Sequence, residues 1–117
     1  MRREQIFERD QYRCVYCGGV FPAEELTVDH VQARVRRGDR SAGNLVTACS
    51  GCNTAKGHRK AAQFLRDNSR ARENFLRYAR HVWPRLLREI RDLTARARTA
   101  DPQRHGRRGV LGGGEGS

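Results

Sequence analysis

Three short stretches decide the fold of this chain: LTVDHV at residues 26–31, NLVTA at residues 44–48 and CSGC at residues 49–52. The first two are brief and rich in Val, Leu and Thr, a composition that favours β-strands. Because they follow one another along the chain, we expect them to pair as a hairpin. The pattern turns helical after the third stretch, so the sequence predicts two strands followed by a helix.

A long connection separates the two predicted strands. It reads QARVRRGDRSAG over residues 32–43, and loops of this length usually carry function or are disordered. The segment is strongly basic, with arginines at four positions: Arg34, Arg36, Arg37 and Arg40. We expect these side chains to touch the substrate.

The four cysteines form two C-x-x-C pairs, Cys14 with Cys17 and Cys49 with Cys52, separated by 31 residues. Each pair can present two thiolates to one tetrahedral ion, so the spacing predicts a zinc site. Four thiolates leave no open coordination position, which makes this one zinc structural and puts any chemistry elsewhere. The alternatives are four reduced cysteines without metal, or a redox pair, which lacks a surrounding thioredoxin-like pattern.

The chain is short and very basic. It has 117 residues, of which 37% are hydrophobic, and 24 Lys or Arg against 13 Asp or Glu give a net charge of +11. Such a chain is one domain at most with a thin core, so a metal staple is expected. The charge favours nucleic acid as partner over a membrane, because no apolar stretch approaches the roughly 20 residues of a membrane span. A merely soluble, salt-tolerant surface is the alternative.

The segments that flank the predicted core differ from it in character. Residues 2–10 are expected to form a short helix held by Ile6 and Phe7. Apolar residues recur at spacings of three and four farther along, at Phe75, Leu76, Ala79, Val82, Leu86, Ile90 and Leu93. Pro84 interrupts this run and predicts two helices or one kinked helix, with His81 on a helix face. The N-terminus lacks an apolar secretory segment, so a cytoplasmic, reducing location is expected.

We expect three regions: a core at residues 1–59, a basic helical extension packed on it at residues 60–99, and a disordered Gly- and Arg-rich tail at residues 101–117. The extension carries eleven Lys or Arg against four Asp or Glu, so positive charge is concentrated behind the cysteines. The tail has almost nothing to bury, which is the reason to expect disorder there.

Asp29-His30, Gly43-Asn44-Leu-Val and Cys49-x-x-Cys52-Asn53 occur in an order that closely resembles the HNH endonuclease family, in the subgroup with two zinc knuckles. The likeness runs from about residue 2 to residue 57. It implies an α+β fold with a small ββα-metal, treble-clef-like core. It also implies His30 as general base, Asp29 and Asn53 as ligands of a catalytic metal, and Asn44 as the residue that holds the intervening loop.

The residue types suit phosphodiester hydrolysis independently of the resemblance. An imidazole can take a proton from water near neutral pH, and oxygen ligands such as those of Asp29 and Asn53 hold hard divalent cations. Mg²⁺ is expected, or another divalent metal such as Mn²⁺, Ni²⁺ or Zn²⁺. Asn53 stands where the namesake sequence has His, which preserves a ligand. A regular strand would point Asp29 and His30 to opposite faces.

The sequence therefore predicts a metal-dependent DNA endonuclease that nicks as a monomer; cutting both strands would require a homodimer or two visits. The apolar face around Phe75, Trp83 and Leu87 fits either core or a dimer interface. The competing hypotheses are a non-catalytic zinc-stabilised nucleic-acid-binding module and a scaffold for an acidic protein partner. DNA contacts are expected from basic residues near the site: Arg34, Arg36, Arg37, Arg40, Lys56 and Arg59.

Overall fold

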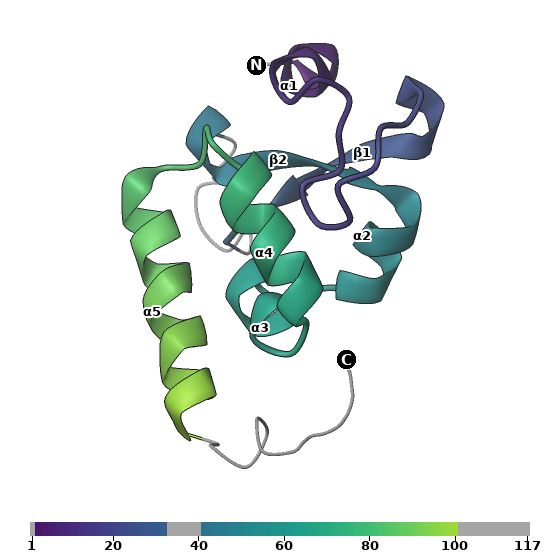
Figure 1. Cartoon of the computed structure of the whole chain (residues 1–117). Helices are drawn as coiled ribbons and strands as arrows, with labels where there is room; N and C mark the ends of the chain where they lie inside the picture. The colour runs from purple at the N-terminus through teal and green to yellow at the C-terminus, as the bar shows by residue number, and fades with distance from the viewer. Residues whose placement is uncertain (1, 33–40, 101–117) are drawn as a thin grey trace.

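The computed structural model describes residues 2–32 and 41–100, and its fold is α+β, as predicted. The expectations for the arginine-rich loop and for the tail at residues 101–117 concern residues outside these ranges. Figure 1 shows the arrangement of the elements. In chain order they are α1 (Arg3–Arg9), η1 (Ala23–Glu25), β1 (Leu26–His30), η2 (Ala42–Asn44), β2 (Leu45–Cys49), α2 (Ser50–Lys56), α3 (Ala61–Arg66), α4 (Ser69–Tyr78) and α5 (Pro84–Ala100).

The two strands pair antiparallel, which confirms the predicted hairpin. Leu26 lies opposite Cys49 at one end of the pairing, and His30 lies opposite Leu45 at the other. Every residue of β2 is buried, whereas in β1 only Leu26 and Asp29 are buried and the other three residues are half-buried. The strand β2 is therefore covered by other elements, and β1 keeps partly open positions for polar side chains.

One short helix precedes the hairpin in the sequence and another follows it, and both pack against its strands. The helix α1 buries Ile6 and Phe7, as expected from its apolar pair. The helix α2 follows β2 directly, and the Cys49 thiol accepts a hydrogen bond from the amide of Cys52 at 3.4 Å. It ends at Gly57, whose φ of 63° is a conformation that glycine adopts without strain. The expected ββα order is thus present.

Pro84 separates two helices rather than kinking one. It is the first residue of α5, a position where the missing amide proton costs no hydrogen bond. Residues 79–83 form the connection between α4 and α5. His81 lies in this connection and is exposed, so the expectation that it sits on a helix face was wrong. The proline starts the second helix and leaves the preceding residues to form a turn.

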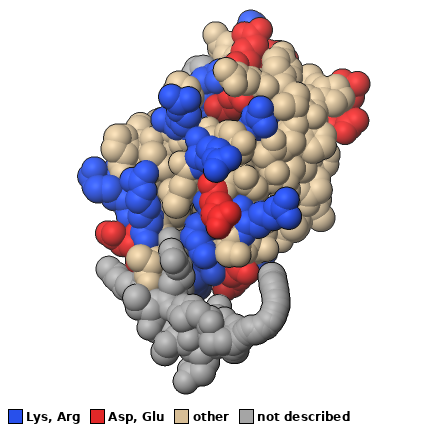
Figure 2. Space-filling model, viewed as in Figure 1, with Lys and Arg blue, Asp and Glu red and all other residues tan. Residues whose placement is uncertain are grey.

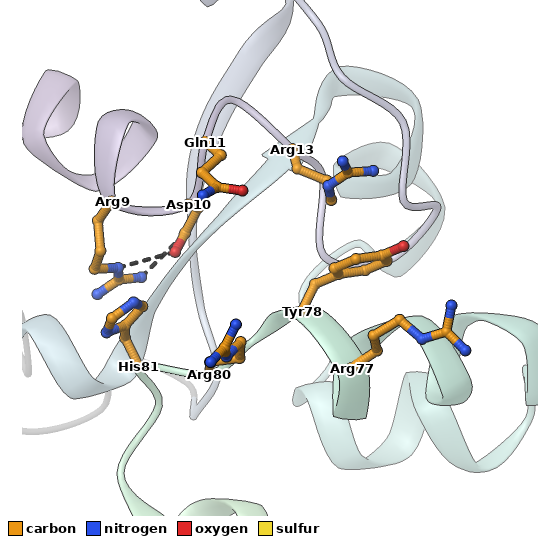
Figure 3. Close-up of a pocket in the computed structure, with 8 residues that line it drawn as sticks. All are labelled: Arg9, Asp10, Gln11, Arg13, Arg77, Tyr78, Arg80 and His81. Atoms are coloured by element: carbon orange, nitrogen blue, oxygen red, sulfur yellow. Dashed lines mark hydrogen bonds and ion pairs between the residues drawn. The ribbon is translucent and has the colours of Figure 1, made fainter.

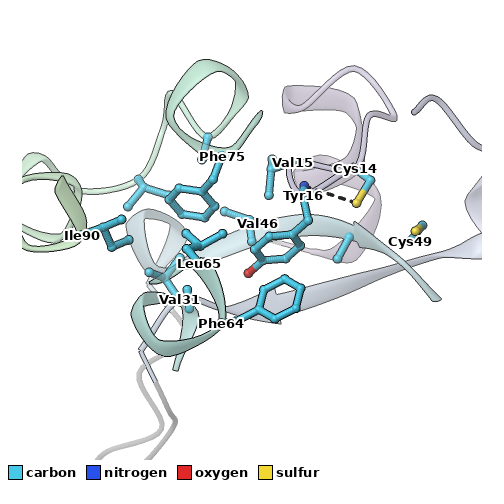
Figure 4. Packing of buried hydrophobic residues seen from close by; sticks show 14 of the residues in the cluster. Cys14, Val15, Tyr16, Val31, Val46, Cys49, Phe64, Leu65, Phe75 and Ile90 are labelled. Atoms are coloured by element: carbon cyan, nitrogen blue, oxygen red, sulfur yellow. Dashed lines mark hydrogen bonds between the residues drawn. The ribbon is translucent and has the colours of Figure 1, made fainter. Parts of the chain in front are cut away.

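One buried cluster joins the hairpin, the first cysteine pair and the helices α3, α4 and α5 (Figure 4). The ring of Tyr16 stacks on Phe75 from α4 at a centroid distance of 5.7 Å and meets Phe64 from α3 edge-on at 5.5 Å. Phe75 is fully buried, and Trp83 and Leu87 pack against the same cluster. The sequence left open whether the apolar face around Phe75, Trp83 and Leu87 is core or a dimer interface, and the structure makes it part of the core of one chain.

Across the described ranges, none of the helices is long and apolar enough to cross a membrane. The boundary between residues 59 and 60 stays a prediction.

Candidate functional site

The four cysteine sulfurs lie together, all within 4.8 Å of one another. One pair comes from a tight turn in which the Gly18 amide donates to the Cys14 carbonyl at 2.8 Å. The other pair comes from the end of β2 and the first turn of α2. In a tetrahedral site the sulfurs stand about 3.8 Å apart when each lies about 2.3 Å from zinc. The 4.0 Å between the sulfurs of Cys17 and Cys49 fits that geometry, so this donor set can hold one zinc ion.

The thiols respond differently to their crowding. Burial raises the pKa of Cys14 to about 11 and raises the pKa of Cys52 further. Burial also acts to raise the pKa of Cys49, but hydrogen bonds from the Cys52 amide and the neighbouring thiols outweigh it and lower the pKa overall. Four thiolates this close together repel, and a divalent cation among them removes that penalty because it binds the deprotonated form.

A second polar cluster lies where β1 meets α2. Asp29 is 8% exposed, and its carboxylate receives hydrogen bonds from two side chains. The Tyr16 hydroxyl donates to Oδ2 at 2.6 Å, and the Lys56 ammonium lies 3.2 Å from each carboxylate oxygen. Burial and the nearby Asp29 charge raise the pKa of Tyr16 well above its usual range, so the phenol keeps its proton and donates it. The Asp29 carboxylate is therefore fixed in place.

His30 is the neighbour of Asp29 on β1, and Asn53 lies on α2, the helix that carries Lys56. His30 follows Asp29 at the end of β1 and is half-buried, and its backbone carbonyl accepts from Lys56 Nζ at 3.4 Å. Asn53 is half-buried on α2, three residues before Lys56, a spacing that puts two side chains on one face of a helix. Lys56 reaches Asp29 from this helix. The structure thus places Asp29 and His30 next to Lys56 of α2, with Asn53 one helical turn before Lys56.

Asn44 closes the base of the arginine-rich loop. Its side chain is fully buried; its carboxamide oxygen accepts from the Gln32 amide at 2.9 Å and its Nδ2 donates to the Gln32 carbonyl at 3.3 Å. The Val31 amide donates to the Asn44 carbonyl at 2.9 Å. Residues on either side of the loop are therefore joined directly, next to His30.

The residue before Asn44 packs against the C-terminal helices. The Trp83 amide donates to the Gly43 carbonyl at 3.0 Å, and the indole lies so close that a Cβ on Gly43 would be 2.1 Å from Trp83 Cδ1. Only glycine leaves room for this contact. The segment between α4 and α5 therefore supports the base of the loop.

Comparison with known proteins agrees with this arrangement. Residues 14–59, which hold both cysteine pairs and the β1–α2 junction, match the family model described as HNH endonuclease. Residues 14–59 are an HNH endonuclease domain. The chain is also 31% identical over 68 residues to the CRISPR-associated endonuclease Cas9 of Corynebacterium diphtheriae, a match that covers 57% of this chain and 6% of that protein.

The fold likeness reaches beyond the HNH domain. The crystal structure of the Type II-C Cas9 enzyme from Actinomyces naeslundii superposes with a TM-score of 0.52 and 23% sequence identity. That match covers 82% of this chain and 11% of the solved chain. The chain therefore spans only a small part of both relatives, and the shared fold includes residues outside positions 14–59.

The basic residues expected to contact DNA are placed differently from one another. Lys56 is 3% exposed and paired with Asp29 in the HNH domain, so a phosphate contact, as expected for it, would require that pair to open. Arg59 is exposed, and its guanidinium donates to the carbonyls of Ala55 and Lys56 at the end of α2. The four loop arginines, Arg34, Arg36, Arg37 and Arg40, lie outside the described residues.

Tyr16 is the site residue that the sequence did not indicate. It stands between the first two cysteines, where an aromatic side chain reads as core, and its ring is indeed buried. Only the fold shows that its hydroxyl reaches Asp29, thirteen residues away. The one signal in the sequence was the presence of Tyr rather than Phe inside the C-x-x-C turn, since only Tyr adds a hydroxyl to the buried ring.

Proposed function

We propose that this protein is a metal-dependent endonuclease that hydrolyses phosphodiester bonds of DNA, with one active site that nicks one strand as a monomer. The observation that carries the proposal is the junction of β1 and α2, where a fixed Asp29 carboxylate adjoins His30 and the Asn53 face of α2. The HNH endonuclease match supports this class of reaction.

Each residue of the junction has a proposed role. His30 acts as the general base that takes a proton from the attacking water. Asp29 and Asn53 hold a divalent cation, Mg²⁺ or another such as Mn²⁺, Ni²⁺ or Zn²⁺, and their oxygen donors suit a hard ion. When bound, this cation stabilises negative charge on the phosphate and on the leaving oxygen. Asn44 fixes the loop beside His30, and the four-cysteine zinc is structural.

DNA is the proposed substrate because of charge. The net charge of +11 attracts a polyanion, and on the face seen in Figure 2 Lys and Arg side chains gather over α4 and α5 with a few Asp and Glu among them. The loop arginines and Arg59 are proposed to contact backbone phosphates, which gives binding without sequence preference. A zinc-stabilised module that binds nucleic acid without cleaving it is the second candidate, because the same charge supports it.

The test is cleavage of supercoiled plasmid by the full chain with Mg²⁺, Mn²⁺, Ni²⁺ or Zn²⁺, with EDTA as control. Open-circular product that accumulates before linear product is the expected result for nicking. Sedimentation at the same protein concentration checks the monomer. No cleavage with any metal, together with a shifted DNA band on a gel, would favour the binding module instead.

A further inference from the structure

A cleft with a volume of about 250 Å³ lies between the segment that joins α1 to Cys14 and the end of α4 (Figure 3). One wall is the end of α1 and the residues that lead to Cys14, and the other is the end of α4 with the connection to α5. Four arginines and one histidine line it against a single carboxylate, that of Asp10. The proposed roles of the HNH residues make no use of it.

The single acidic residue of the cleft is already neutralised. Arg9 donates to the Asp10 carboxylate through Nε at 2.9 Å and through Nη2 at 3.0 Å, and the Thr47 amide donates to the same carboxylate at 3.0 Å. Arg9 also donates to the carbonyls of Ala42 and Leu45. This buried pair holds α1 on the hairpin. The hydrogen-bonding groups of Asp10 and Arg9 are therefore already engaged within the fold.

The other basic residues leave positive charge in excess. The Arg13 guanidinium lies 4.8 Å from the Tyr78 ring centroid and donates one hydrogen bond, to the Gly18 carbonyl, which leaves most of its five N–H groups available. Arg77, Arg80 and His81 are exposed. Within residues 2–32 and 41–100, no ion pair or side-chain hydrogen bond engages Arg77 or Arg80.

A purely structural role explains only part of this cluster. Arginine in the last turn of a helix stabilises the negative end of the helix dipole, and Arg77 is in the last turn of α4. Arg80 and His81 lie beyond that helix, and Arg13 comes from a segment more than sixty residues away. Their convergence on one cleft is not needed to end α4.

We propose that this cleft binds a backbone phosphate of the nucleic acid. The planar guanidinium of arginine can donate two hydrogen bonds to the oxygens of one phosphate. The one aromatic ring that lines the cleft, Tyr78, is covered by Arg13 and is not free to stack on a base. The cleft therefore suits a phosphate and not a base. Arg9 ties the cleft to Leu45, the register partner of His30. This hydrogen bond fixes one wall of the cleft to β2, the strand that pairs with β1. The inference rests on the proposed function.

The test measures duplex DNA affinity against salt for the full chain carrying His30→Ala, without added divalent metal, so that the DNA stays intact. Arg80→Glu should weaken binding and reduce the slope of log K against log salt by about 0.9, the value for one lost phosphate contact. The matched control is Arg66→Glu, an exposed arginine at the end of α3 that does not line the cleft, which should leave the slope unchanged. Circular dichroism and zinc content must match among the variants.

A second measurement separates a DNA phosphate from free phosphate. Inorganic phosphate is added to the wild type and to Arg80→Glu, and the shift in melting temperature is recorded. Phosphate protection that Arg80→Glu abolishes, together with the changed DNA slope, supports the proposal. Phosphate protection with an unchanged DNA slope would overturn it and leave a site for small anions. If the wild type cleaves plasmid but Arg80→Glu leaves the slope of log K against log salt unchanged, only the phosphate site in the cleft is disproved. If the wild type does not bind DNA, both the phosphate site and the proposed function are disproved.

Discussion

The hydroxyl of Tyr16 lies 2.6 Å from Oδ2 of Asp29, in the buried space between the first cysteine pair and β1. Tyr16 is flanked in the sequence by Cys14 and Cys17, so its position depends on the turn that presents those thiols. Its ring is held at the same time by Phe64 and Phe75. The contact links the structural cysteine site to the carboxylate proposed to hold the catalytic metal.

Tyr16→Phe removes this hydroxyl and keeps the ring. A hydrogen bond to a charged group contributes about 1.5 to 3 kcal/mol, so the free energy of unfolding should fall by up to that amount. With one of its two donors gone, Asp29 should hold the divalent metal less well, and half-maximal cleavage should require more metal. Titration of cleavage rate with Mg²⁺ checks this. Tyr12→Phe, at a half-buried tyrosine packed on Phe7, is the control; equal metal requirements for all three proteins would exclude the positioning role.

The cysteine cluster should hold one zinc ion per chain after dialysis. Cys49→Ser should lose the metal and cooperative unfolding, because a structural zinc site contributes roughly 10 to 16 kcal/mol in zinc-finger peptides. Elemental analysis and thermal unfolding measure the two effects. A metal-free protein that unfolds with full cooperativity would rule the site out.

Zinc uptake should release protons at pH 7.5. Burial raises the pKa of Cys14 to about 11 and raises the pKa of Cys52, so both thiols are protonated in the metal-free protein at that pH. Zinc binds the thiolates, and its apparent affinity should therefore increase as the pH rises. Titration of metal-free protein with zinc in a weakly buffered indicator solution counts the protons. Absence of release would mean that the thiols are already ionised.

His30→Ala and Asp29→Ala should fail in different ways. Loss of the base should reduce cleavage by roughly 10² to 10⁴ while DNA binding and zinc content stay unchanged. Loss of the carboxylate should instead weaken metal binding, and high metal concentration should partly restore cleavage. Plasmid nicking by both variants over a range of Mg²⁺ concentrations makes the comparison. A His30→Ala protein that cleaves as fast as the wild type would return the chain to the class of binding modules.

Gly43→Ala should disturb the loop base from the side of the C-terminal helices. The added Cβ would lie 2.1 Å from Trp83 Cδ1, so the indole must move, and overpacking of this kind costs about 1 to 3 kcal/mol. The emission of Trp83, the one tryptophan of the chain, should shift and cleavage should decrease. Gly51→Ala is the control, since its Cβ would meet nothing nearer than the Cys49 sulfur at 4.0 Å. Unchanged emission and stability in Gly43→Ala would contradict the contact.

Local patterns in the sequence were sufficient to predict the hairpin, the helix after Cys49 and the meeting of the four cysteines. Strand composition, the spacing of Cys14 and Cys17, and the conformational limits of Pro84 all act over a few residues. Contacts between distant segments were not accessible in this way. The sequence predicted Lys56 as a DNA contact, but only packing shows that its side chain is buried against Asp29.

The cleft shows the same limit. Each of its arginines belongs to an ordinary basic stretch of the sequence, and nothing in those stretches indicates that Arg13 and Arg80 share one cavity. The sequence likewise predicted a helical position for His81, whereas the structure places it in the turn after α4. Residues whose roles depend on the meeting of two remote segments require the fold.

The packing of Tyr16 on Phe75 has a consequence for the transfer of this domain into another protein. The segment that carries the family signature ends at residue 59, yet the ring of Tyr16 and the glycine before Asn44 are covered by side chains that come after it. A fusion that transplanted residues 14–59 alone would leave an apolar surface open to water and invite aggregation. A host for this domain must therefore inherit the trailing helices or supply an equivalent cover.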